Sequence, residues 1–113
     1  MSLVYQYTCE SKRMELAEIA EKVRRINATL VTQRERYFDG SAVILLIFEK
    51  YYMRADGYAS LTVLLSEDGP VQNADVIGYG GGQGLFNLSW GANEDFADMA
   101  ADILEKCGFV LEQ

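Results

Sequence analysis

An uninterrupted apolar run, Ala42 to Phe48, constrains the fold of this chain more than any other feature. Asp-Gly pairs at residues 39–40, 56–57 and 68–69 separate β-prone segments. Such pairs favour tight hairpin turns, because glycine readily adopts a positive φ. Residues 41–53 are therefore predicted to form one strand of an antiparallel meander. Because this strand is apolar at both parities, both of its faces should be covered for part of its length.

Further strands are predicted on either side of this central one. β-prone or alternating residues indicate strands at 3–8, 28–38, 58–66, 71–79 and 85–90. Two helices would have to cover the same face of such a sheet. The opposite face of the 42–48 strand then requires a second layer, either a sheet-to-sheet homodimer or a curled sheet.

Two helices are predicted from apolar stripes with a spacing of three to four residues. The first spans residues 12–26, with Ser11 as its N-cap. The second begins at the N-cap Asn93, and Gly108 follows it as the C′ residue. These elements predict a single α+β domain over residues 1–113: an antiparallel β-meander of about five to six strands in the order β-α-β(4–5)-α, with both helices on one face.

The charge of the chain and the length of its apolar runs argue against nucleic-acid binding and membrane insertion. The formal net charge is −7 and there is no histidine, whereas nucleic-acid binding needs a clustered basic face. No apolar run approaches the roughly 20 residues that span a bilayer, and we expect a cytoplasmic protein without membrane contact. Basic residues gather in the first third and acidic ones near the end. This asymmetry fits self-association, although solvated helix faces of opposite sign explain it more simply.

The two cysteines do not indicate a metal or a cofactor. Cys9 and Cys107 lack a CxxC pairing, and there is no histidine to complete a zinc site. Cys107 lies on the apolar stripe of the second predicted helix, so we expect it in the core. The role of Cys9 is left open. We predict no metal and no cofactor.

A glycine-rich segment, Gly78 to Gly84, is the most unusual stretch of the sequence. Successive free N–H groups could cradle an anion, but a GxGxxG frame fails here and no lysine follows for a P-loop. A flexible hairpin or a glycine bulge is the simpler interpretation. Aromatic residues nearby could line a pocket or an interface. The candidate ligand-binding residues are Tyr51, Tyr52, Tyr79, Gly80, Gly81, Gly82, Gln83 and Trp90.

Catalytic residues cannot be assigned from the sequence. Serine and cysteine nucleophiles usually depend on a histidine base, which this chain lacks. Carboxylates for acid–base chemistry could come from Glu35, Glu49, Asp75 and Glu94, but nothing in their spacing selects a pair.

Four short blocks are similar to a family of small uncharacterised bacterial proteins known only as a domain of unknown function. They are residues 48–53 (FEKYYM), 60–63 (SLTV), 81–86 (GGQGLF) and 91–96 (GANEDF). Members of that family tend to carry serine and alanine near positions 82 and 84, where this chain has glycine. The resemblance implies a fold and a bacterial origin, and it supplies no catalytic residues.

Three functions remain open on these grounds. The favoured one is a non-enzymatic domain that acts by homo-oligomerisation or by binding another protein through its sheet. The alternative is a small-molecule binder with a pocket near the Gly78–Gly84 hairpin. A histidine-free enzyme is third.

Overall fold

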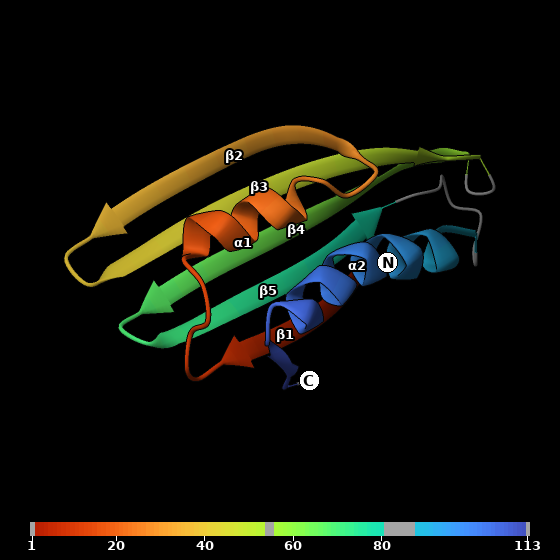
Figure 1. Ribbon diagram of the computed structural model, residues 1–113. Coiled ribbons are helices and arrows are strands. Elements are labelled where there is room, and N and C mark those ends of the chain that lie inside the picture. Colours follow the sequence, from red (N-terminus) through yellow and green to blue (C-terminus); the bar gives the residue numbers. More distant parts are fainter. Residues whose placement is uncertain (1, 54–55, 81–87, 113) are drawn as a thin grey trace.

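The chain forms one six-stranded antiparallel sheet and two helices (Figure 1). The computed structural model describes residues 2–53, 56–80 and 88–112, with the backbone alone at residue 2 and over residues 88–93. In chain order the elements are β1 (Ser2–Cys9), α1 (Leu16–Val23), β2 (Thr29–Phe38), β3 (Ser41–Tyr52), β4 (Gly57–Asp68), β5 (Val71–Gly80), α2 (Leu88–Lys106) and β6 (Val110–Leu111). The strands lie in the order β2-β3-β4-β5-β1-β6. The predicted α+β class and the antiparallel meander are therefore confirmed.

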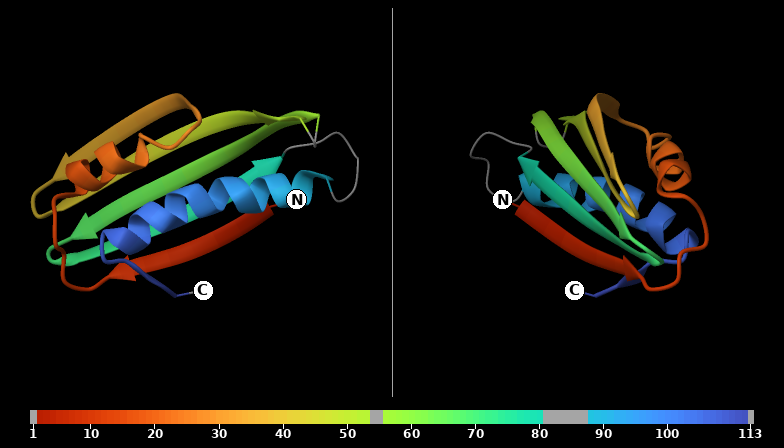
Figure 2. Two further views of the ribbon diagram at one scale, coloured as in Figure 1. Left: turned by 45° about the vertical axis from the view of Figure 1, so that its right-hand side comes forward. Right: turned by 90° about the vertical axis from the view of Figure 1, so that its left-hand side faces the viewer.

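Both helices pack on the same face of the sheet. Helix α1 lies over β3 and β4, and α2 lies over β5, β4 and β1. Figure 2, in its right-hand view along the layers, shows the two helices on one side of the strands. Among the described residues, no helix or strand lies against the opposite face. We call the helix-covered side the inner face and the opposite side the outer face.

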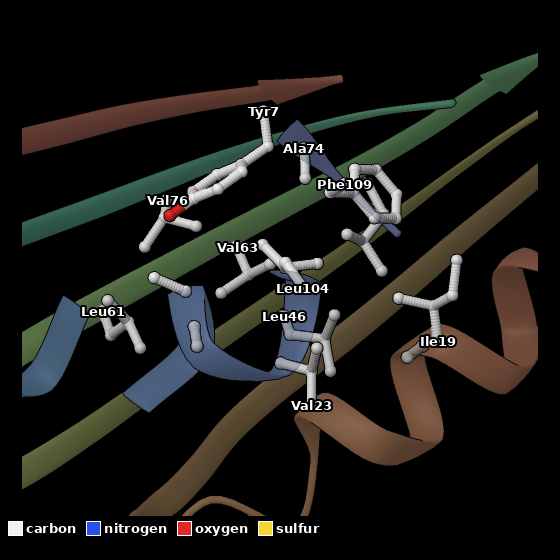
Figure 3. Close-up of a cluster of buried hydrophobic side chains, with 14 of the residues drawn as sticks. Tyr7, Ile19, Val23, Leu46, Leu61, Val63, Ala74, Val76, Leu104 and Phe109 are labelled. Atoms are coloured by element: carbon white, nitrogen blue, oxygen red, sulfur yellow. The ribbon is translucent and has the colours of Figure 1, made fainter. Parts of the chain in front are cut away.

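The core lies between the helices and the inner face (Figure 3). On β3 the even-numbered residues Ile44, Leu46 and Phe48 are 0% exposed, and residues 61, 63 and 65 of β4 are also fully buried. Helices α1 and α2 contribute Ile19, Val23 and Leu104 from the other side. Each fully buried side chain of this size stabilises the fold by about 1.5–3 kcal/mol. Burial against the helices thus explains why the even-numbered residues 44, 46 and 48 of β3 are apolar.

The first helix is shorter than predicted. Helix α1 begins at Leu16, after Glu15 in the N-cap position, and the predicted N-cap Ser11 lies well before it. The backbone N–H of Lys12 donates to the carbonyl of Pro70 at 2.8 Å, and Nε2 of the buried Gln72 donates to the carbonyl of Met14 at 3.0 Å. These bonds hold residues 12–14 against the β4–β5 turn in a non-helical conformation.

The predicted strand at residues 85–90 is wrong for residues 88–90, the part of it that the structure describes. Residues 88–90 form the first turn of α2, so the helix begins before the predicted N-cap Asn93. Residues 85–87 lie outside the described part of the chain. The physical reason is that β5 already pairs with β4 on one side and with the N-terminal β1 on the other. A strand that follows β5 therefore has no free edge of β5 to join.

The turns and the end of α2 agree better with the sequence. Gly40 adopts φ +82° in the two-residue loop between β2 and β3, as predicted. At the 56–57 pair the positive φ belongs instead to Asp56, at +47°, and Gly57 begins β4. After α2, Gly108 has φ +99° and the N–H of Phe109 donates to the carbonyl of Leu104 at 3.0 Å. This is a Schellman-type helix end with Gly108 at C′, as predicted.

A buried tyrosine ties β1 to α2. Tyr7 is 3% exposed, and its hydroxyl donates to Oε2 of Glu105 at 2.9 Å. Burial, followed by this hydrogen bond, raises the pKa of Tyr7 above its ordinary value of 10.0. The folded chain therefore retains the phenolic proton at a pH where the unfolded chain loses it, and the free energy of unfolding should fall as the pH rises above about 10.

Replacing Tyr7 with phenylalanine is expected to lower the free energy of unfolding by about 1 kcal/mol at neutral pH, because one hydrogen bond to a carboxylate is lost. The substitution should also make the fall in stability between about pH 9 and about pH 11 shallower. Urea unfolding at a series of pH values measures both effects. An unchanged alkaline slope would show that Tyr7 titrates alike in the folded and unfolded chains.

Candidate interaction surface

The outer face of the sheet is apolar at its centre, and strand pairing arranges its residues in rows. Across neighbouring strands, paired residues point to the same face. The pairs Thr32 with Ile47, Ile47 with Thr62, and Thr62 with Ile77 form one row from β2 to β5. The next row contains Leu45 and Leu64 at its centre. Val43 on β3 and Val4 on β1 extend the apolar surface.

The odd-numbered residues 43, 45 and 47 of β3 are also apolar, and they point to the outer face. Val43, Leu45 and Ile47 are half-buried by their neighbours within the sheet alone. Contiguous apolar surface on a sheet face with no covering element is a candidate interaction site. The outer face of β2–β5 is therefore the candidate functional surface of the chain.

One row of this face contains two charges of opposite sign, on β2 and β5, and continues beyond β5 to Gln6 on β1. Arg34 of β2 pairs with Leu45, Leu45 with Leu64, and Leu64 with Asp75 of β5. No hydrogen bond or ion pair joins Arg34 or Asp75 to any other residue in the described ranges. They lie three strands apart, about 14 Å, and cannot reach each other within one chain. Asp75 is half-buried, between Leu64 on β4 and Gln6 on β1.

Tyrosines gather at the end of the outer face where β3 meets β4. Tyr51 pairs with Tyr58 across these strands, and their rings meet edge to face with centroids 5.3 Å apart. Tyr79 on β5 lies one row away, opposite Ser60. Tyr58 and Tyr79 are 62% and 59% exposed. The hydroxyl of Tyr51 donates to Oδ1 of Asp56 at 2.8 Å, and this hydrogen bond raises its pKa.

The structure separates the predicted ligand-binding residues. Tyr51 and Tyr79 share the outer face, whereas Tyr52 points to the inner face and its ring lies 6.0 Å from that of Phe96. Gly80 ends β5 with φ +87°. Trp90 lies in α2, but its side chain is outside the description, as are Gly81, Gly82 and Gln83. A pocket that uses this set remains a prediction.

The candidate carboxylates on the sheet do not converge, and the fourth, Glu94, lies in α2. Glu35 faces inward on β2 and accepts bonds from Gln33 and Tyr37. Glu49 and Asp75 face outward, but on different rows and on strands that are not neighbours. No cluster of three or more potential metal ligands occurs in residues 2–53, 56–80 and 88–112. Within the same ranges, no helix has the length and apolar character to cross a bilayer.

Both cysteines are buried as free thiols. The prediction that Cys107 belongs to the core is confirmed, and Cys9 joins it there. Burial raises the pKa of the Cys107 thiol, so this side chain is a weak nucleophile.

The described residues form hollows beside α1, on the helix side of the sheet. One of about 530 Å³ opens between α1 and the β2–β3 and β4–β5 turns, beside Lys12, Tyr37 and Pro70. Lys12 pairs there with Glu67 at 3.4 Å, and Glu67 also accepts a bond from Gln72. Another, about 290 Å³, lies between α1 and α2. Neither hollow contains a residue of the predicted ligand-binding set.

Comparison with known proteins gives a family but no activity. The model of a family of unknown function, DUF6054, matches residues 4–108. The chain belongs to DUF6054. The matched range includes every element from β1 to α2, except for the first two residues of β1. No curated protein and no solved structure matched this DUF6054 member. The expected membership of a family of unknown function is thus confirmed.

Proposed function

We propose that this chain is a non-enzymatic module that acts by forming a homodimer through the outer face of its sheet. The observation that carries the proposal is the apolar centre of that face, residues 43, 45 and 47 of β3 with Leu64 and Ile77, which no described element of the chain covers. Removing such surface from water is the main driving force of protein association.

The size of the face suits a stable dimer. From Ser41 to Glu49 the outward residues of β3 span roughly 30 Å, and the four strands β2–β5 span roughly 19 Å. A flat projection of this size is roughly 600 Å², and side-chain relief makes the accessible area larger. A typical stable interface buries about 800 Å² per partner. Two such sheets pack face to face about 10 Å apart, as in β-sandwiches.

Size-exclusion chromatography with light scattering tests this proposal. Between about 1 µM and about 200 µM the measured mass should rise toward twice the 12.7 kDa of one chain. A mass of one chain at every concentration would overturn the proposal. A bacterial origin belongs to the same proposal. So does a cytoplasmic location, because two free thiols suit a reducing compartment.

The alternative function is the binding of a small molecule near the glycine segment. Its support is the shared outward position of Tyr51, Tyr58 and Tyr79 at one end of the face. Aromatic rings offer stacking surfaces to planar ligands. A thermal-shift screen of planar metabolites, repeated with Tyr79→Ala, tests this alternative. A ligand that stabilises the original chain and not the variant would support it, and the absence of any stabilising ligand would remove it.

A further inference from the structure

The outer-face row from Arg34 to Asp75 determines how a second copy of the chain can be oriented against the first. This inference rests on the proposed homodimer and specifies its symmetry. Across the outer face the row reads Arg34, Leu45, Leu64, Asp75 on the consecutive strands β2, β3, β4 and β5. Over these four strands it has opposite charges on β2 and β5 and two leucines between them, and the polar Gln6 of β1 follows Asp75.

We propose that two copies dock face to face about a two-fold axis that runs along the strands between β3 and β4. Rotation about this axis exchanges β2 with β5 and β3 with β4. It places Arg34 of each copy opposite Asp75 of the other, and Leu45 opposite Leu64. Each dimer then contains two identical ion pairs on either side of a leucine cluster, as an isologous interface requires.

The neighbouring rows agree with this axis. The Thr32–Ile47–Thr62–Ile77 row places Ile47 opposite Thr62 and Thr32 opposite Ile77 of the second copy. The row on the other side has Arg36 on β2 and Asn73 on β5, and it continues to Thr8 on β1. Its charged end therefore meets a polar amide. In these three rows, no charge faces a like charge and no charge faces an apolar side chain.

The other two-fold arrangement of stacked sheets fails at these residues. The alternative axis lies parallel to the plane of the sheet but perpendicular to the strands. It places each strand opposite the same strand of the second copy. Arg34 on β2 then never meets Asp75 on β5, and the half-buried carboxylate is enclosed without a cation. Leaving a buried charge without a partner costs several kcal/mol. Stacked sheets cross at about 30°, which offsets opposite residues by a few Å, and the long arginine side chain can span that offset.

Charge reversal tests the axis. The single variants Arg34→Asp and Asp75→Arg should each weaken the dimer by at least about 30-fold, since both symmetry-related pairs become repulsive. An equimolar mixture of the two variants should form heterodimers with an affinity near that of the original chain. In such a heterodimer one ion pair has its original sign and the other has reversed sign, so neither pair is repulsive. Sedimentation velocity of each variant and of the mixture gives these affinities.

Arg36→Asp is the matched control, because Arg36 faces Asn73 and not a carboxylate. It should weaken the dimer by less than about 5-fold. Its heterodimer with Asp75→Arg should be weaker than that of Arg34→Asp with Asp75→Arg, because one repulsive pair remains, between Arg34 of one copy and the arginine introduced at position 75 of the other. If the original chain dimerises but the two reversals fail to rescue each other, the proposed axis is wrong while the homodimer stands. If the original chain is monomeric at every concentration, the homodimer itself is wrong and the axis fails with it.

Discussion

Replacing Leu45 with glutamate is expected to convert the dimer into a folded monomer. Leu45 lies at the centre of the outer face, and in the proposed dimer it packs against Leu64 of the second copy. A charge at this position would be enclosed twice in each dimer without a partner. Loss of a central interface side chain typically costs about 2 kcal/mol or more, and two symmetric copies give at least about a 100-fold weaker dimer.

Sedimentation equilibrium measures this effect, with circular dichroism to confirm that the variant folds. Leu111→Glu is the matched control, since Leu111 is 48% exposed on β6, at the far edge of the sheet. The control should retain the dimer. A Leu45→Glu chain that sediments as the original chain does would show that association uses another surface.

Replacing Phe48 with alanine should have the largest effect on the stability of the monomer. Phe48 is 0% exposed on the inner face and pairs with the fully buried Leu61 on β4. Removing its ring leaves a cavity beneath the helices, and such substitutions cost about 3–5 kcal/mol. This is a large part of the roughly 5–15 kcal/mol that stabilises an ordinary domain.

Urea unfolding in the Leu45→Glu background measures this loss without a contribution from association. Ile47→Ala is the control on the adjacent residue, which points to the outer face. In the monomeric background it should cost less than about 1 kcal/mol, since its side chain contacts only neighbours in the sheet. Similar losses at residues 47 and 48 would show that both faces of β3 are buried within one chain.

Much of the sheet could be predicted because its signals are local. Asp-Gly pairs placed the turns after β2 and β4, and the alternation in β4 identified its inner face. The first helix and the segment at 85–90 were mispredicted for reasons that lie elsewhere in the chain. The carbonyl of Pro70 and the side chain of Gln72 hold residues 12–14, and β1 occupies the edge beside β5. Contacts between distant segments leave no periodic pattern in the sequence.

Only part of the candidate surface was predicted from the sequence. Apolar residues at both parities of β3 predicted that a second face needs a cover, but Arg34 was not recognised as part of it. The signal was present in the loop lengths. Two-residue loops after Phe38 and Asp68 fix the register of both hairpins, and this register places Arg34 beside Leu45 and Asp75 beside Leu64. Only the register between β3 and β4 requires the structure, because their connection is longer.

Solvent accessibility of the outward methyl groups tests the homodimer most directly. NMR spectra of methyl-labelled protein at about 300 µM would be recorded with a soluble paramagnetic agent, for the original chain and for Leu45→Glu. In the original chain the methyl groups of Ile47 and Leu64 should be as protected as those of the buried Leu46, and in the variant they should broaden. Methyl groups of Ile47 and Leu64 that broaden in the original chain as strongly as those of Leu111 would contradict a dimer through this face.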